Sequence, residues 1–153
     1  MSATQPTPAG IVNFSRVNAT VACGGATEPS AMAALAAEGF KSVINLRLAS
    51  EPGVAEEAAV VEQAGMTYIH LPMDGSAPEN ATAERFLEAI ANPANQPAYI
   101  HCASANRVGA MWAIKRVVLD GWPRDRAIAE GQAIGLKSPA LVDFVNRFLD
   151  ARR

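Results

Sequence analysis

The sequence predicts an α/β fold with three layers, in which a mainly parallel sheet carries helices on both faces. Short apolar runs typical of buried strands alternate along the chain with stretches in which apolar residues recur at helical spacing. One run, Val43-Ile44-Asn45-Leu46, is nearly continuous, as expected for a strand that is covered on both faces. Ligands of such sheets bind beyond the carboxyl ends of the strands, so the loops at those ends matter most.

The first half of the chain supplies three strands and two helices. We expect a strand at 17–23, followed by a helix that Thr27 caps and Gly39 ends. The Val43 strand comes next, and a helix whose apolar residues recur from Val54 ends at Gly65. The third strand is expected at 66–72.

The second half supplies one strand and four helices. Asn80 is a plausible cap for a helix that Pro93 ends, and Pro97 then introduces the strand before Cys102. A further helix follows Arg107. Two further helices are indicated by a proline in the first turn. Pro123 begins one of them, and Ser138-Pro139 begins the other.

Length and charge narrow the class of protein. The 153 residues fit one domain, which we expect at 12–153, after a flexible N-terminal lead-in at 1–11. The net charge of −2 argues against nucleic acid or an acidic membrane as the main partner. No stretch has the roughly 18 unbroken apolar residues of a membrane span.

The two cysteines, Cys23 and Cys102, form neither a disulfide framework nor a metal site by their spacing, and no cofactor is predicted. Residues 1–10 are rich in Pro, Thr and Ala and lack the apolar core of a signal peptide. The chain as given is therefore expected in the cytoplasm, or in the periplasm if a signal peptide has been removed, and the sequence leaves the compartment open.

The most informative stretch is the short polar loop between the Ala98-Tyr99-Ile100 strand and the helix that follows. Backbone N–H groups of such a loop and of the first helical turn converge on one point, where the helix dipole adds positive charge. Arg107 can grip two oxygens of an oxyanion there, and the same environment favours the thiolate of Cys102. We predict that Cys102 is a nucleophile and that the substrate contacts the rest of the loop, namely His101, Ala103, Ser104, Ala105 and Asn106.

His101-Cys102 followed by a short loop and Arg107 resembles the signature of cysteine-dependent phosphatases of the tyrosine and dual-specificity type. The loop has one residue fewer between Cys and Arg than those phosphatases, which is nearer to some rhodanese-like sulfurtransferases. The sequence is most similar to the bacterial beta-lactamase-hydrolase-like phosphatase family, which has a phosphatase-like fold and this shorter loop. The resemblance extends from about Phe14 to the C-terminal helix, and is carried by 41–47, 68–74 and the Cys102 loop.

The resemblance implies further roles. His101 would support the loop and the thiolate, and Asp74 would protonate the leaving oxygen from the loop after the 66–72 strand. Asp74-Gly75-Ser76 is equally a common turn composition, and Glu79 is a second candidate acid on this loop. Arg47 is expected either to bind substrate or to form an ion pair with Glu51 or Asp74.

Two positions depart from the phosphatase pattern. Ala105 stands where the resembled families usually have Gly, which is costly if this residue needs a positive φ. Val108 stands where phosphatases carry the Ser or Thr that assists loss of the cysteine from the phosphoenzyme. Cys23 is expected to be a packed residue, and a reversible disulfide with Cys102 would require that their strands are neighbours.

Three functions follow from these observations. The favoured one is a phosphatase that hydrolyses a phosphomonoester, either of the protein tyrosine or dual-specificity type or a small molecule, through a phosphocysteine. The runner-up is a sulfurtransferase that stores sulfur as a Cys102 persulfide between a sulfur donor and an acceptor. The third is a module that binds an oxyanion without catalysis.

Overall fold

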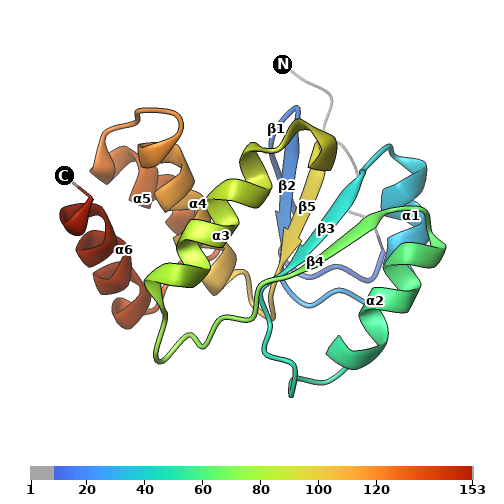
Figure 1. The fold of residues 1–153 in the computed structure, drawn as a ribbon. Coiled ribbons are helices and arrows are strands. Elements are labelled where there is room, and N and C mark those ends of the chain that lie inside the picture. Colours follow the sequence, from blue (N-terminus) through green and yellow to red (C-terminus); the bar gives the residue numbers. More distant parts are fainter. Residues whose placement is uncertain (1–8, 153) are drawn as a thin grey trace.

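Residues 9–152 are described by a computed structural model, in which the strands form one five-stranded sheet with the order β1-β2-β5-β3-β4 (Figure 1). The strands β2, β5, β3 and β4 run parallel, and β1 pairs antiparallel with β2 at one edge. The strand before Cys102 is thus the central one, flanked by β2 and β3. The bounds of the strands are β1 Ser15–Asn18, β2 Val21–Gly24, β3 Ser42–Asn45, β4 Thr67–His70 and β5 Ala98–His101.

Helices cover both faces of the sheet, as the α/β class requires (Figure 1). One face carries α1 Ala31–Ala37 and α2 Val54–Gln63. The other carries α3 Asn80–Ala91, α4 Asn106–Val118, α5 Arg124–Ile134 and α6 Pro139–Ala151, and a short 3-10 turn, η1 Pro93–Asn95, follows α3. The predicted fold class is confirmed. Among the described residues, no helix is long and apolar enough to cross a membrane.

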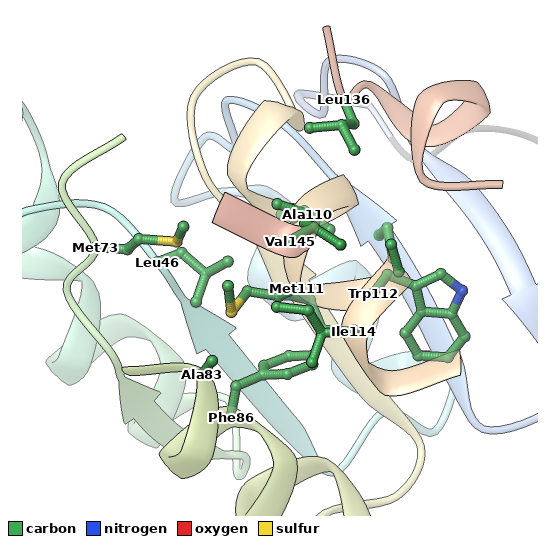
Figure 2. Packing of buried hydrophobic residues seen from close by; sticks show 14 of the residues in the cluster. Leu46, Met73, Ala83, Phe86, Ala110, Met111, Trp112, Ile114, Leu136 and Val145 are labelled. Atoms are coloured by element: carbon green, nitrogen blue, oxygen red, sulfur yellow. The ribbon is translucent and has the colours of Figure 1, made fainter. Parts of the chain in front are cut away.

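Each face of the sheet has its own apolar core because successive strand residues point to opposite sides. Ile100 points to the larger core, where Met111 and Ile114 of α4 lie beside Phe86 of α3 (Figure 2). Trp112 belongs to the same core, on a side of α4 that faces away from Phe86. Burying a side chain of this size stabilises the fold by about 1.5–3 kcal/mol. Tyr99, the preceding residue of the strand, points to the smaller core beneath α1 and α2.

Three local predictions were wrong. The expected strand at 17–23 is a hairpin of β1 and β2, because the Asn18 side chain accepts hydrogen bonds from the backbone N–H and hydroxyl of Thr20 and turns the chain. Thr27 does not cap α1, since its hydroxyl bonds Gly25 O and the Tyr99 hydroxyl instead. Asn80 is the first residue of α3, and the cap position before it belongs to Glu79.

Parallel pairing places the carboxyl ends of the central strands at one edge of the sheet. Asn45, the last residue of β3, lies opposite His101 of β5 on one side and opposite His70 of β4 on the other. The chain segments that follow these residues therefore leave the sheet side by side, at the bottom of Figure 1. They carry Cys102, Arg47 and Asp74, as the sequence predicts.

Candidate active site

Cys102 begins the connection between β5 and α4 and is fully buried. Its backbone N–H donates to Gly24 O at 3.4 Å, which extends the pairing of β5 with β2 by one residue. The helix α4 then begins at Asn106, whose side chain does not cap it but accepts the backbone N–H groups of Lys137 and Ser138. The free N–H groups of the first turn of α4 are therefore available to an anion.

Hydrogen bonds from residues outside the loop orient its peptide groups. Ala26 N–H donates to Ala103 O at 2.6 Å, and the Asn13 side chain donates to Ser104 O at 3.1 Å. In a trans peptide the C=O and the following N–H point in opposite directions, so the N–H groups of Ser104 and Ala105 face away from these partners. Within residues 9–152, the N–H groups of Ala103, Ser104 and Ala105 have no acceptor. Three adjacent donors are thus open to an oxyanion.

Ala105 adopts the left-handed conformation, with φ +73°. This conformation costs an L-residue roughly 1–2 kcal/mol. That cost arises here because Ala105 stands where the resembled families usually have Gly. Gly135 packs directly against it, since a Cβ on Gly135 would lie 2.8 Å from the Ala105 Cβ and 2.9 Å from the Ala105 O. The α5–α6 connection, which contains Gly135, therefore packs against the strained Ala105 and restricts its movement.

Arg107 points its guanidinium at the β3–α2 and β4–α3 connections. Nη1 and Nη2 donate to the two carboxylate oxygens of Glu51 at 2.7 and 2.9 Å, and Nη1 also donates to Met73 O at 3.0 Å. Among the described residues, the Nε–H and one N–H of Nη2 bind no carbonyl or carboxylate oxygen, and the guanidinium also interacts with the Cys102 side chain. These two N–H groups form the side edge of the guanidinium, which matches two oxygens of a phosphate.

The ion pair between Arg107 and Glu51 stabilises the charged form of both side chains. The hydrogen bonds from Arg107 lower the pKa of Glu51, against the opposing effect of its partial burial. The same bonds raise the pKa of Arg107, and so does the interaction of its guanidinium with Cys102. Arg107 is therefore a permanent cation that lies beside both Glu51 and the predicted nucleophile.

Asp74 lies on the same edge, directly after the Met73 carbonyl that Arg107 binds. Its carboxylate accepts the backbone N–H of Ser76 at 2.9 Å and the Ser76 hydroxyl at 2.6 Å, which is the turn role that the sequence offered as an alternative. The Ser76 hydrogen bonds, helped by the charge of Arg107, lower the pKa of Asp74. The Asp74 side chain is exposed, so it is accessible to a substrate although Ser76 hydrogen-bonds one of its oxygens. Glu79, at the cap position of α3, is exposed as well.

His101 contacts a buried ion pair of Glu57 and Arg47 on the face of the sheet that α1 and α2 cover. Its Nε2 lies 2.6 Å from Glu57 Oε2, and its ring stacks on Tyr99 at 5.5 Å between centroids. The other oxygen of Glu57 accepts from Arg47 Nη2 at 3.1 Å. Arg47 thus pairs with Glu57, and the predicted pairing with Glu51 or Asp74 is wrong, because Arg47 turns toward α2 and leaves Glu51 to Arg107.

The second cysteine lies on the strand next to the nucleophile. Cys23 of β2 pairs in register with Ile100 of β5, so the strands of the two cysteines are neighbours. Both thiols are free and fully buried. Burial raises the pKa of Cys23 far above its usual range, and the nearby Cys102 raises it further. Cys23 is therefore a packed neutral thiol.

The structure brings together Cys102, Arg107, the loop residues and the Asp74 segment, and it adds residues that the sequence did not reveal. Glu51 was expected only as a partner of Arg47, and its Glu-Pro-Gly context gave no sign that it would meet Arg107, which is 56 residues away. Glu57, Ala26 and Asn13 carry no motif either. No group of three or more His, Cys, Asp or Glu within residues 9–152 could hold a metal ion.

Comparison with known families gives an independent result. A family model described as "DSP-PTPase phosphatase fused to NAD+ Kinase" matches residues 6–139, which is most of the chain and includes the whole Cys102 loop. The beta-lactamase hydrolase-like protein of Xylella fastidiosa is 29% identical over 135 residues, covering 86% of this chain and 31% of that protein. The one from Agrobacterium fabrum is 30% identical over 110 residues, covering 69% of this chain and 25% of that protein. This chain thus spans about a third or less of the length of the curated relatives it matches, and the predicted resemblance is confirmed.

Solved structures agree on the fold. The core catalytic domain of the PP-IP phosphatase SIW14 from S. cerevisiae, in complex with citrate, superimposes with a TM-score of 0.77 at 22% identity, covering 92% of this chain and 88% of that one. TpbA from P. aeruginosa, solved as a cysteine-to-serine variant in complex with pTyr, gives a TM-score of 0.72 at 20% identity over 94% of this chain and 85% of that one. At these identities the likeness concerns the fold.

Proposed function

We propose that this chain, which belongs to the family of DSP-PTPase phosphatases fused to NAD+ kinase, is a cysteine-dependent phosphatase that hydrolyses a phosphomonoester. One observation carries the proposal. In the loop that joins Cys102 to Arg107, the backbone N–H groups of Ala103, Ser104 and Ala105 have no acceptor among residues 9–152, and the Arg107 guanidinium interacts with Cys102. Such a set of donors fits a tetrahedral dianion, whose equatorial oxygens they would bind.

The chemistry needs two displacements at phosphorus. In the first, the Cys102 thiolate forms an S–P bond while the bond to the leaving oxygen breaks, and Asp74 donates a proton to that oxygen. In the second, water attacks phosphorus, the S–P bond breaks, and inorganic phosphate leaves while Asp74 takes up the proton of the water. The loop donors and Arg107 stabilise the equatorial oxygens in both steps.

The substrate beyond its phosphate is a second part of the proposal. The hollow of about 210 Å³ that adjoins the loop is lined by Asn13 and Gly135, which lie on the side of the loop away from its open N–H groups, so it does not extend the position proposed for the phosphate. The names of two structural neighbours point to candidate substrates instead, since TpbA is in complex with pTyr and SIW14 is named a PP-IP phosphatase. A phosphotyrosine peptide and a small phosphomonoester are therefore the two substrate types to compare.

The experiment is release of phosphate from p-nitrophenyl phosphate by the wild type and by Cys102→Ser, with thiosulfate-to-cyanide sulfur transfer measured on the same preparations. We expect phosphate release that Cys102→Ser lowers by about ten-thousandfold. Cys23→Ser is the matched control, because it changes the other buried cysteine outside the loop.

Each result decides between the candidate functions. Turnover retained in Cys102→Ser would contradict the covalent mechanism. Sulfur transfer without phosphate release would establish the rhodanese-like alternative, which the family match does not support. Absence of both activities, with inorganic phosphate still bound, would indicate the non-catalytic module.

A further inference from the structure

A second cavity lies beside the Cys102 loop on the α1 and α2 side of the sheet. It has a volume of about 560 Å³, within the range of sites that hold small molecules. The connections β2–α1 and β3–α2 form its walls with residues 10–12, and none of the described residues that line it belongs to the Cys102 loop. It is therefore distinct from the position in which the proposed phosphate would bind.

The walls are largely apolar, and their buried charged groups are Arg47 and Glu57. Ile11, Val12, Ala26 and Pro29 contribute apolar surface, whereas Arg47 and Glu57 bring a buried ion pair. Such a cavity, apolar with a few polar groups, is the usual form of a small-molecule site.

The polar groups determine which ligand would fit. Both oxygens of Glu57 are taken, one by Arg47 and one by His101. Within residues 9–152, Arg47 uses its Nε–H and one N–H on each terminal nitrogen, so two N–H groups have no acceptor there, and 9% of the residue is exposed. The site therefore offers hydrogen-bond donors and needs an acceptor on the ligand.

The charges near the cavity select against an ionic ligand. The charge of Arg47 is balanced by Glu57, and Glu28 adds a carboxylate at the exposed part of the wall. An anion would meet this carboxylate, and a cation would meet the donors of Arg47. We propose that this cavity binds a small, uncharged and largely apolar molecule whose carbonyl or ring-nitrogen acceptor takes the free N–H groups of Arg47.

Hydrogen bonds connect the wall of this cavity to the Cys102 loop, although the loop does not line the cavity. The Ala26 N–H that orients the Ala103 peptide belongs to a residue of the cavity wall. Glu57 in turn contacts His101, the residue before the nucleophile. The molecule in this cavity and a phosphate at Cys102 would thus bind at the same time, on opposite sides of the same peptides.

Coumarin is a suitable probe, because it is uncharged and apolar and carries a lactone carbonyl. Its binding is measured by saturation-transfer NMR on the full chain, alone and with saturating inorganic phosphate. Ala26→Trp and Val12→Trp place an indole in the cavity from two exposed wall positions, and Ala33→Trp makes the same change at an exposed site on α1 outside it. Thermal unfolding of each variant verifies that it is folded.

We expect saturable binding that phosphate does not displace, that both wall variants weaken by at least about tenfold, and that Ala33→Trp leaves unchanged. Displacement by phosphate would overturn the proposal, because it would place coumarin in the anion site. Absence of saturable binding, or undiminished binding in both folded wall variants, would overturn it as well. These results do not depend on phosphatase activity, so failure of the proposed function would be seen separately.

Discussion

Glu51 and Arg107, which are 56 residues apart in the sequence, form a bidentate ion pair at the carboxyl edge of the sheet. Glu51 is itself fixed, because its Oε2 also accepts the backbone N–H of Leu48 at 2.6 Å. The carboxylate occupies the end of the guanidinium and leaves the side edge, with Nε, for a substrate oxyanion. In the proposed mechanism, Glu51 therefore positions the arginine and stays in place when phosphate binds.

Substitution of Glu51 by Gln should lower kcat/KM for p-nitrophenyl phosphate by about 10- to 100-fold. Glutamine has one acceptor in place of two and carries no charge, so the guanidinium would lose its fixed orientation. Glu56→Gln is the control, since Glu56 is exposed on α2 and differs from Glu51 in having no contact with Arg107. An unchanged kcat/KM in Glu51→Gln would show that the pair does not position Arg107 for catalysis.

The pH dependence should report on Asp74. A general acid must be protonated, so the rate with a poor leaving group falls as pH rises through its pKa. The Ser76 hydrogen bonds lower that pKa and thus move the falling limb toward acid. Ser76→Ala removes the hydroxyl bond, so the limb of the kcat/KM profile should shift to higher pH. If the limb keeps its position in Ser76→Ala, or if Asp74→Asn has the same profile as the wild type, Asp74 is not the general acid. Glu79 would then be the next candidate.

The packing of Gly135 on Ala105 should be visible in both stability and activity. Gly135→Ala places a methyl group 2.8 Å from the Ala105 Cβ, and we expect a loss of about 1–3 kcal/mol in the free energy of unfolding, with a reduced kcat/KM. Gly121→Ala is the control: it also has a positive φ, of +71°, but nothing lies within 4 Å of the added methyl. Denaturant unfolding and turnover of both variants separate the two effects. Equal activity in the two variants would mean that the loop does not depend on this contact.

Cys23 should be dispensable for turnover although it lies next to the strand of Cys102. Burial holds its pKa far above the usual range, so it stays a neutral thiol and does not act as a nucleophile. Cys23→Ala should keep kcat/KM within about twofold and lower the free energy of unfolding by about 1 kcal/mol, because it leaves a small cavity. A large loss of turnover in this folded variant would instead assign Cys23 a part in the reaction.

The sequence alone predicted the class of fold, which the structure confirms, and it predicted the Cys102 loop as the centre of the candidate site. Alternating apolar runs and helical periodicity are local patterns, and they suffice to indicate a parallel sheet between helices. The Cys102 loop is also local, since six consecutive positions carry the thiol, the donors and the arginine. The parallel arrangement then requires Asp74 and Arg47 to emerge at the same edge as Cys102.

Only the tertiary structure decided which side chains pair across that edge. The sequence paired Arg47 with Glu51 or Asp74 and gave Arg107 no protein partner, whereas the structure joins Arg47 to Glu57 and Arg107 to Glu51. These pairs depend on where each connection turns after its strand, and that direction is set by packing between segments far apart in the chain. Such contacts leave no periodic or spacing signal in the sequence, so local patterns predict candidate reactive residues but not the residues that contact and orient them.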